Sequence, residues 1–174
     1  MTSVGLNFRA LYLELVDSTE MIRALLAGLT QDEARAKPEP VSWSILETLC
    51  HLLDEERLDF RRRLDALVNH PAEEWEPIDP EAWVRERHYN EQDFRDVKER
   101  FFSERSKSLD WLKGLEHTSW DANYTASFGT ITAGELFASW VAHDNLAIRQ
   151  LVELRRARLE RITSPLSIEY AGEW

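Results

Sequence analysis

Two polar residues, His143 and Gln150, lie on the apolar face of a long predicted helix, where their side chains could bind a ligand or a metal ion. With Leu136 as the reference in the window that begins at Thr132, His143 lies about 20° from the apolar stripe and Gln150 about 40° from it. Both are therefore predicted to point inward. A neutral imidazole can bind a metal ion or exchange a proton near neutral pH. The alternative is that His143 is a hydrogen-bonded core residue.

His51 lies in an earlier helical window, and its spacing places it less clearly. It falls about 140° from Leu46, off the main apolar stripe of that window. Its side chain is expected either to face a secondary cleft flanked by Trp43, Glu47 and Asp54 or to face solvent.

Arg105 is a cationic side chain on a third apolar stripe, about 20° from Phe94. An inward arginine needs an acidic partner within the protein or an anionic ligand. The spacing alone leaves both alternatives open.

Common catalytic motifs are absent from the sequence. It contains no P-loop and no GxGxxG, GxSxG, HExxH or CxxC pattern. The residues alone therefore indicate no nucleophile and no acid–base pair.

The elements that must position these side chains are four long helices, predicted from apolar residues at a spacing of 3.6. The windows run from Leu6 to Leu29, from Ser44 to Asn69, from Asn90 to Leu115 and from Thr132 to Thr163. Capping boxes, in which Ser or Thr precedes Glu by three residues, are predicted at Thr30, Ser44 and Thr132.

The connections between these windows are long. Short helices are expected after Thr30 and over Glu81–Arg87, where Asp79 and Pro80 are typical of a helix start. Residues Trp120–Ile131 are expected to be non-helical, with a turn at Ser127–Thr130. The tail Leu166–Trp174 is expected to pack back on the bundle or on a partner.

These elements predict an all-α protein, a four-helix bundle with long connections between its helices, in which residues 1–174 form a single domain. A chain of 174 residues can bury a core without a metal ion or a disulfide. Bundles of this kind carry their sites between facing helices or at one open end.

Composition narrows the classes of partner. The net charge of −11 disfavours binding to nucleic acid or to an anionic membrane surface. The single cysteine, Cys50, excludes an intrachain disulfide and indicates a reducing compartment. Without a signal-like start or about 18 consecutive apolar residues, the chain is expected to be cytoplasmic.

Several of these segments together resemble the DinB-like superfamily. Trp43–Glu47 followed by His51–Asp54 is similar to its second-helix signature. The fourth-helix signature is matched by Phe128–Thr132, Glu135–Leu136, Trp140–Asp144 and Gln150. The region Trp83–Leu112, with Tyr89, Phe101 and Arg105, and the ending Tyr170–Trp174 are similar as well, so the resemblance covers nearly the whole chain.

The resemblance implies an up-down-down-up bundle, often a homodimer, and in many members a divalent metal held by three histidines. His51 matches the ligand on the second helix, and His143 matches the first ligand on the fourth helix. The third histidine should stand four residues later, where this sequence has Ala147. A carboxylate could replace it, either Glu55, four residues after His51, or Asp144, next to His143.

Two functions follow from this pattern. The first is a small-molecule-binding bundle with a degenerate metal site, in which Trp43, Arg105, Trp140, Ala147 and Gln150 line the ligand pocket. The second is an enzyme dependent on Zn, Ni or Fe that uses a low-molecular-weight thiol as a transferase or isomerase, as characterised members of the family do.

Overall fold

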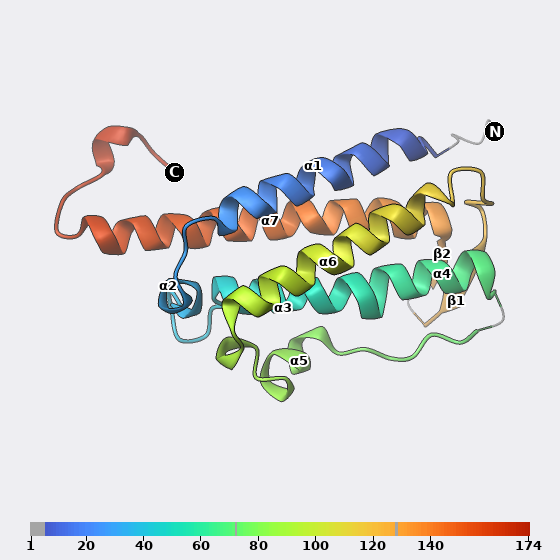
Figure 1. Ribbon diagram of the computed structural model, residues 1–174, viewed down its shortest axis with the longest axis horizontal. Helices are drawn as coiled ribbons and strands as arrows, with labels where there is room; N and C mark the ends of the chain where they lie inside the picture. The colour runs from blue at the N-terminus through green and yellow to red at the C-terminus, as the bar shows by residue number, and fades with distance from the viewer. Residues whose placement is uncertain (1–5, 72, 128) are drawn as a thin grey trace.

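The structure is a computed structural model that describes residues 6–71, 73–127 and 129–174 (Figure 1). The long helical elements are α1 (Phe8–Leu26), α3 (Ile45–Asp54), α4 (Arg61–Asn69), α6 (Phe94–Lys113) and α7 (Ala133–Thr163). The shorter ones are α2 (Gln31–Arg35), α5 (Pro80–Glu86), the 3₁₀ turns η2 (Tyr89–Glu91) and η3 (Glu169–Ala171), and the π-helical turn η1 (Glu55–Phe60). The strands are β1 (Asn123–Ala126) and β2 (Gly129–Thr132).

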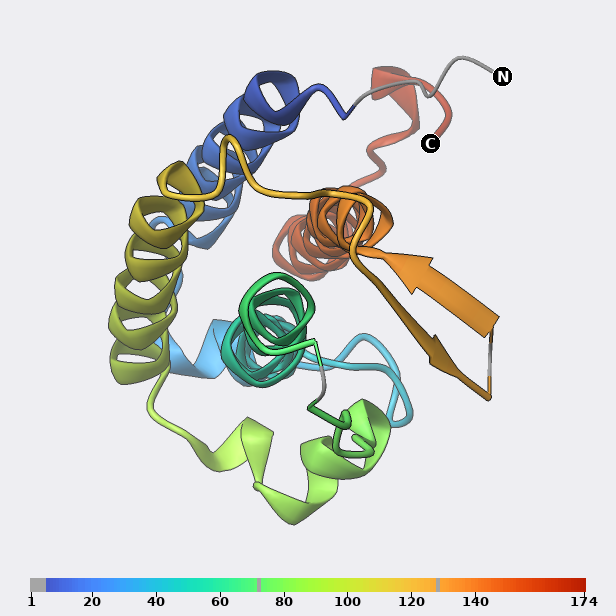
Figure 2. The same ribbon diagram turned by 90° about the vertical axis from the view of Figure 1, so that its right-hand side faces the viewer.

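Four long segments form a bundle with up-down-down-up topology. Because η1 joins α3 to α4 without a break, these two helices act as one segment beside α1, α6 and α7. In Figure 1, α1 and α7 run in one direction, whereas α3–α4 and α6 run in the other. The end-on view in Figure 2 shows α1 and α6 along one side, with α7 and α3–α4 beside them. The predicted four-helix bundle, with its long connections, is confirmed.

The predicted capping boxes set where three helices begin. At Thr30, Ser44 and Thr132 the hydroxyl accepts a hydrogen bond from the backbone N–H three residues later, and that residue's Glu carboxylate accepts one in return. This reciprocal bonding satisfies donors that a helix start otherwise leaves free. Asp79 caps α5 in the expected place, by accepting from the Ala82 N–H.

One predicted boundary was wrong, and one segment predicted only to be non-helical forms a regular hairpin. The third long helix begins at Phe94, not at Asn90, because the Asp93 carboxylate caps it by accepting from the Asp96 N–H. Residues 123–126 and 129–132, expected only to be non-helical, pair as an antiparallel hairpin in which Thr125 lies opposite Thr130. The expected turn at 127–130 includes Phe128, which lies outside the described residues.

The core contains a buried charge network centred on Arg105. Its guanidinium donates to Glu56 Oε2 at 2.8 Å and to Asp144 Oδ2 at 2.7 Å, and it also reaches the Thr19 hydroxyl at 3.0 Å. Only 1% of Arg105 is exposed. Burial by itself would lower the pKa of Arg105, but the two carboxylates raise it above its usual value, so the side chain stays charged. The network ties α6 to α1, η1 and α7.

No helix within residues 6–71, 73–127 and 129–174 is long and apolar enough to cross a membrane.

Replacement of Arg105 by Ala is expected to lower the free energy of unfolding by about 3–5 kcal/mol, because it leaves two buried carboxylates without a cation. Urea unfolding at neutral pH measures this loss. The matched control is Arg95→Ala on the same helix, whose solvent-exposed pair with Glu99 should contribute little to stability. Equal, small losses for both variants would contradict the importance of the network.

Candidate functional site

The structure brings His51 of α3 and His143 of α7 together. Their Nε2 atoms are 3.2 Å apart, and their ring centroids are 5.2 Å apart. All ten residues of α3 are described, and His51 is the one among them that is not fully buried. Of the two alternatives for His51, the structure supports a cleft. Of its three expected flanking residues, Trp43 lines it, whereas Glu47 pairs with Lys37 and Asp54 pairs with Arg57 and Arg87.

Aromatic rings surround the histidine pair. Trp43 meets the His51 ring edge-on, with 5.1 Å between centroids. Phe60 lies 5.2 Å from the His143 ring, and it stacks against Trp140 at 5.8 Å with 5° between the planes. The imidazoles therefore have a largely apolar environment.

Burial keeps both imidazoles neutral. It lowers the pKa of His51 to about 4, helped by the neighbouring His143, and burial also lowers the pKa of His143. When both rings are neutral, one Nε2–H can donate to the other Nε2, and 3.2 Å is at the long end of such a bond.

Glu55 approaches His51 from the opposite side of the ring. Its Oε1 lies 4.0 Å from Nδ1 of His51, and among the described residues neither atom has a hydrogen-bond partner. Burial, followed by the nearby Asp59 carboxylate, raises the pKa of Glu55 to about 8. Asp59 itself contacts the Arg63 guanidinium at 2.8 Å. Glu55 thus faces the nitrogen of His51 that points away from His143.

A groove of about 840 Å³ opens beside the histidine pair. It runs along one face of α7 and is bounded by the segment before α3. Four of the expected site residues besides Ala147 line it, namely Trp43, His51, His143 and Gln150. Ala147 stands one helical turn after His143, and its small side chain leaves that part of the groove open.

Four other expected site residues, Glu55, Arg105, Asp144 and Trp140, do not line this groove, which corrects the sequence-based picture of the pocket. Arg105 is paired with Glu56 and Asp144. Of the two alternatives predicted for Arg105, the structure therefore shows acidic partners within the protein and not an anionic ligand. Both Asp144 oxygens accept from Arg105, so they are not directed at His143. Trp140 is 1% exposed and donates its indole N–H to Glu56 at 3.2 Å.

The donor set fits only part of a metal site. Tetrahedral zinc with Zn–N bonds of about 2.0–2.1 Å places two ligating nitrogens about 3.3–3.4 Å apart, close to the separation of the two Nε2 atoms. Among the described residues, however, no three His, Cys, Asp or Glu side chains are gathered so that they could hold an ion. His51 and His143 fit as two ligands, and within residues 6–71, 73–127 and 129–174 no third such side chain is gathered with them.

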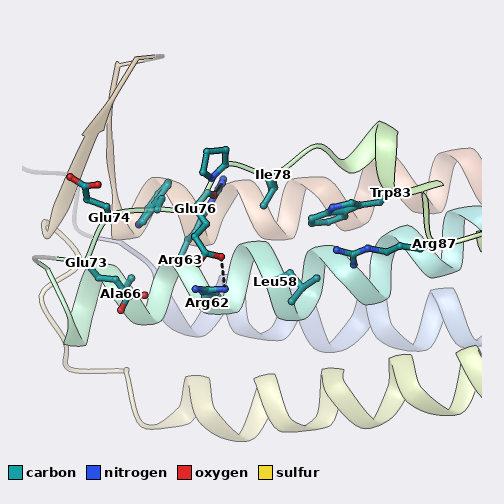
Figure 3. Close-up of a pocket in the computed structure, with 12 residues that line it drawn as sticks. Leu58, Arg62, Arg63, Ala66, Glu73, Glu74, Glu76, Ile78, Trp83 and Arg87 are labelled. Carbon is teal, nitrogen blue, oxygen red and sulfur yellow. Dashed lines mark hydrogen bonds and ion pairs between the residues drawn. The ribbon is translucent and has the colours of Figure 1, made fainter. Parts of the chain in front are cut away.

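A second, smaller pocket of about 220 Å³ lies against α4, beneath residues 73–78 (Figure 3). Its arginines already have acidic partners, since Arg62 pairs with Glu76 at 3.3 Å and Arg87 with Asp54. Arg63 lies 4.8 Å from the Trp75 ring. This pocket therefore presents fewer unpaired polar side chains to a ligand than the groove does.

The fold and the site together define a helical bundle of up-down-down-up topology whose second and fourth long segments each contribute one histidine to a groove. The sequence profile of the DinB superfamily matches residues 14–151. The chain belongs to the DinB superfamily.

One solved structure shows the same fold over most of its length. YfiT from Bacillus subtilis, described as "a probable metal-dependent hydrolase with an unusual four-helix bundle topology", superposes with a TM-score of 0.77 over 90% of each chain. The two sequences are 14% identical, so the likeness concerns the fold. Comparison with curated protein sequences gives no match.

The neutral, largely buried side chain of His51 makes stability depend on pH. Its pKa is about 4 in the folded chain and 6.5 in the reference state, so below pH 6.5 the unfolded chain binds more protons. The free energy of unfolding should therefore fall as the pH drops from 6.5 toward 4, by about 2–3 kcal/mol from His51 at pH 4.5. Urea unfolding in the presence of a chelator measures this fall.

His51→Asn should remove that part of the acid sensitivity, whereas His117→Asn, in an exposed loop position, should keep it. An unchanged pH dependence in His51→Asn would mean that His51 is not buried as a neutral group.

Proposed function

We propose that this protein binds a small organic molecule in the groove beside His51 and His143, and that it has no tightly bound metal of its own. The observation that carries the proposal is the groove of about 840 Å³ with two neutral imidazoles at one end. Sites for small molecules combine apolar walls with a few polar groups that fix orientation. Trp43 supplies an aromatic wall, and Gln150 supplies a further polar group.

The positions of the carboxylates support the metal-free form of this proposal. Catalytic zinc sites have three protein ligands plus water. Of the two carboxylates that could replace the missing histidine, Glu55 faces Nδ1 of His51 and Asp144 is saturated by Arg105. With Ala147 at the third position, two nitrogens would hold an ion weakly.

A metal-dependent enzyme is the second candidate, and one observation favours it. The 3.2 Å between the two Nε2 atoms suits two ligands of one divalent ion, and the structurally similar YfiT is described as a probable metal-dependent hydrolase. His51 and His143 would hold Zn, Ni or Fe, and water or a substrate donor would complete the coordination. Such an ion lowers the pKa of a bound water or thiol. A thiol-using transferase or isomerase is the activity that fits this case.

We further propose that residues 1–174 form a single domain. The protein works in the cytoplasm as a homodimer, without nucleic acid or a membrane as partner. Each of these points is independent of the chemistry in the groove.

Metal content decides between the two candidates. Protein purified without a histidine tag and without added metal should contain well below one equivalent of Zn, Ni or Fe, and chelator should leave its melting temperature unchanged. Elemental analysis and thermal unfolding measure both. Under the same conditions His143→Ala should lower stability by about 1–3 kcal/mol, because the polar pair loses a member. Near one equivalent of metal, with a chelator-induced drop in melting temperature, would favour the enzyme.

Restoration of the third histidine tests the geometry of the site. Ala147→His should raise the affinity for Zn²⁺ by orders of magnitude, because residues four apart share one helical face and the groove has room there. Competition with a chromophoric chelator measures the affinity. Ala142→His, at an exposed position of the same helix, is the matched control and should leave the affinity near that of the unchanged protein. Equal affinities for both variants would show that position 147 does not face the two histidines.

A further inference from the structure

The charged side chains of the groove beside the histidine pair lie mainly at its solvent-exposed edge. Arg149, Glu153 and Glu160 line the groove, and all three residues are exposed. Arg156 is half-buried and is paired with Glu160 at 2.9 Å. The two arginines and the two glutamates of the lining cancel in formal charge. The groove therefore has no surplus charge that would select a charged ligand.

The less exposed part of the lining is mostly uncharged. Its neutral polar residues are half-buried, namely Ser42, His51, His143 and Gln150. Ala147 and Leu154, on the same face of α7 as His143, are buried and apolar. A charged ligand group would lose its hydration against these side chains without gaining a counter-charge from them. This part of the groove therefore favours an uncharged ligand.

The two imidazoles determine which hydrogen bonds a ligand can make at their end of the groove. The Nε2 atoms of His51 and His143 are 3.2 Å apart. Burial lowers the pKa of both side chains, so both rings are neutral and one proton serves the two facing nitrogens. One Nε2 then offers an N–H, and the other offers a lone pair. A ligand atom that reaches both nitrogens must therefore accept one hydrogen bond and donate another.

A hydroxyl group meets this requirement with a single atom. Its oxygen accepts from one Nε2–H and its proton goes to the other Nε2, so each nitrogen keeps a partner. A carbonyl oxygen only accepts and leaves one nitrogen without a donor. An ammonium only donates and a carboxylate only accepts, and each brings a charge to an uncharged surface. The rings of Trp43 and Phe60 beside the imidazoles favour an apolar body next to the hydroxyl.

We infer that the ligand of this groove is an uncharged molecule that carries a hydroxyl group on an apolar body. This inference rests on the function proposed above, and it adds a chemical class to it. The hydroxyl replaces the bond between the two imidazoles, and the apolar body lies along α7 against Ala147 and Leu154. Gln150, on the same face of α7 as His143, offers a donor and an acceptor to a second polar atom of the ligand.

Probes of similar size that differ in one functional group test this class. They are 1-phenylethanol, acetophenone, 1-phenylethylamine and benzoate. Acetophenone only accepts hydrogen bonds, and at neutral pH the amine is a cation and benzoate is an anion. Titrations followed by heteronuclear NMR, in the presence of a chelator, give the Kd of each probe. We expect 1-phenylethanol to bind about fivefold or more tightly than the other probes, since each of them loses a hydrogen bond or leaves a charge unpaired.

Replacement of one imidazole tests the role of the pair. His143→Phe keeps an aromatic ring but removes one nitrogen partner, so 1-phenylethanol and acetophenone should then bind within about twofold of each other. His51→Phe makes the same test from the other ring, and circular dichroism checks that each variant folds. His117→Asn, at an exposed loop position, is the matched control and should keep the preference for the alcohol. A preference that persists in a folded His143→Phe or His51→Phe variant would overturn the inference.

A groove-filling variant separates failure of this inference from failure of the proposed function. Gln150→Trp places a large ring at a half-buried position of the groove and should abolish binding of every probe. If the probes bind alike, or a charged probe binds best, and Gln150→Trp abolishes that binding, the groove remains the site and the hydroxyl class is wrong. If no probe binds, or Gln150→Trp changes nothing, the proposed function fails and this inference fails with it.

Discussion

The ion pairs of Arg105 are the interaction on which the geometry of the groove depends. They hold Glu56, the residue after Glu55, and Asp144, the residue after His143. Successive residues of a helix point about 100° apart, so an inward Asp144 turns His143 to the side of α7 that faces α3. A cation shared by two carboxylates in the core thereby sets the direction of a side chain that it does not touch.

This network also explains which part of the site the sequence could not supply. Periodicity placed Arg105 inward and required an acidic partner or an anionic ligand, but the partners lie 49 and 39 residues away and belong to other elements. On hydrophobic spacing alone Asp144 falls about 80° from Leu136, farther from the stripe than His143. The structure buries Asp144 to 1% exposure because pairing with Arg105 outweighs the apolar pattern. Local signals such as the capping boxes needed no such long-range information, and they were predicted correctly.

His51 was difficult for a different reason. A helical wheel assumes one apolar stripe, whereas nine of the ten residues of α3 are buried because α2, α5, α6, α7, η1 and η2 all pack around it. In such a helix the candidate site residue is the one that is not fully buried. A hydrophobicity pattern does not identify that residue, because the helix has no exposed polar face. The π-helical turn η1 adds a second difficulty, because its wider spacing shifts the phase of later residues. Phe60, the last residue of that turn, therefore could not be assigned to the wall beside His143.

Ala147 links the two candidate functions through one substitution. It supplies no metal donor where the family resemblance implies a third histidine, and its small side chain leaves the groove open beside His143. Without an ion, the two neutral imidazoles can satisfy one nitrogen each by sharing a single proton. A ligand group that both donates and accepts, such as a hydroxyl, would exchange that one long bond for two. A polar ligand group between the His51 and His143 rings would therefore add the most hydrogen bonds to the site. Because the rings around the two imidazoles are apolar, they favour a ligand whose remainder is apolar as well.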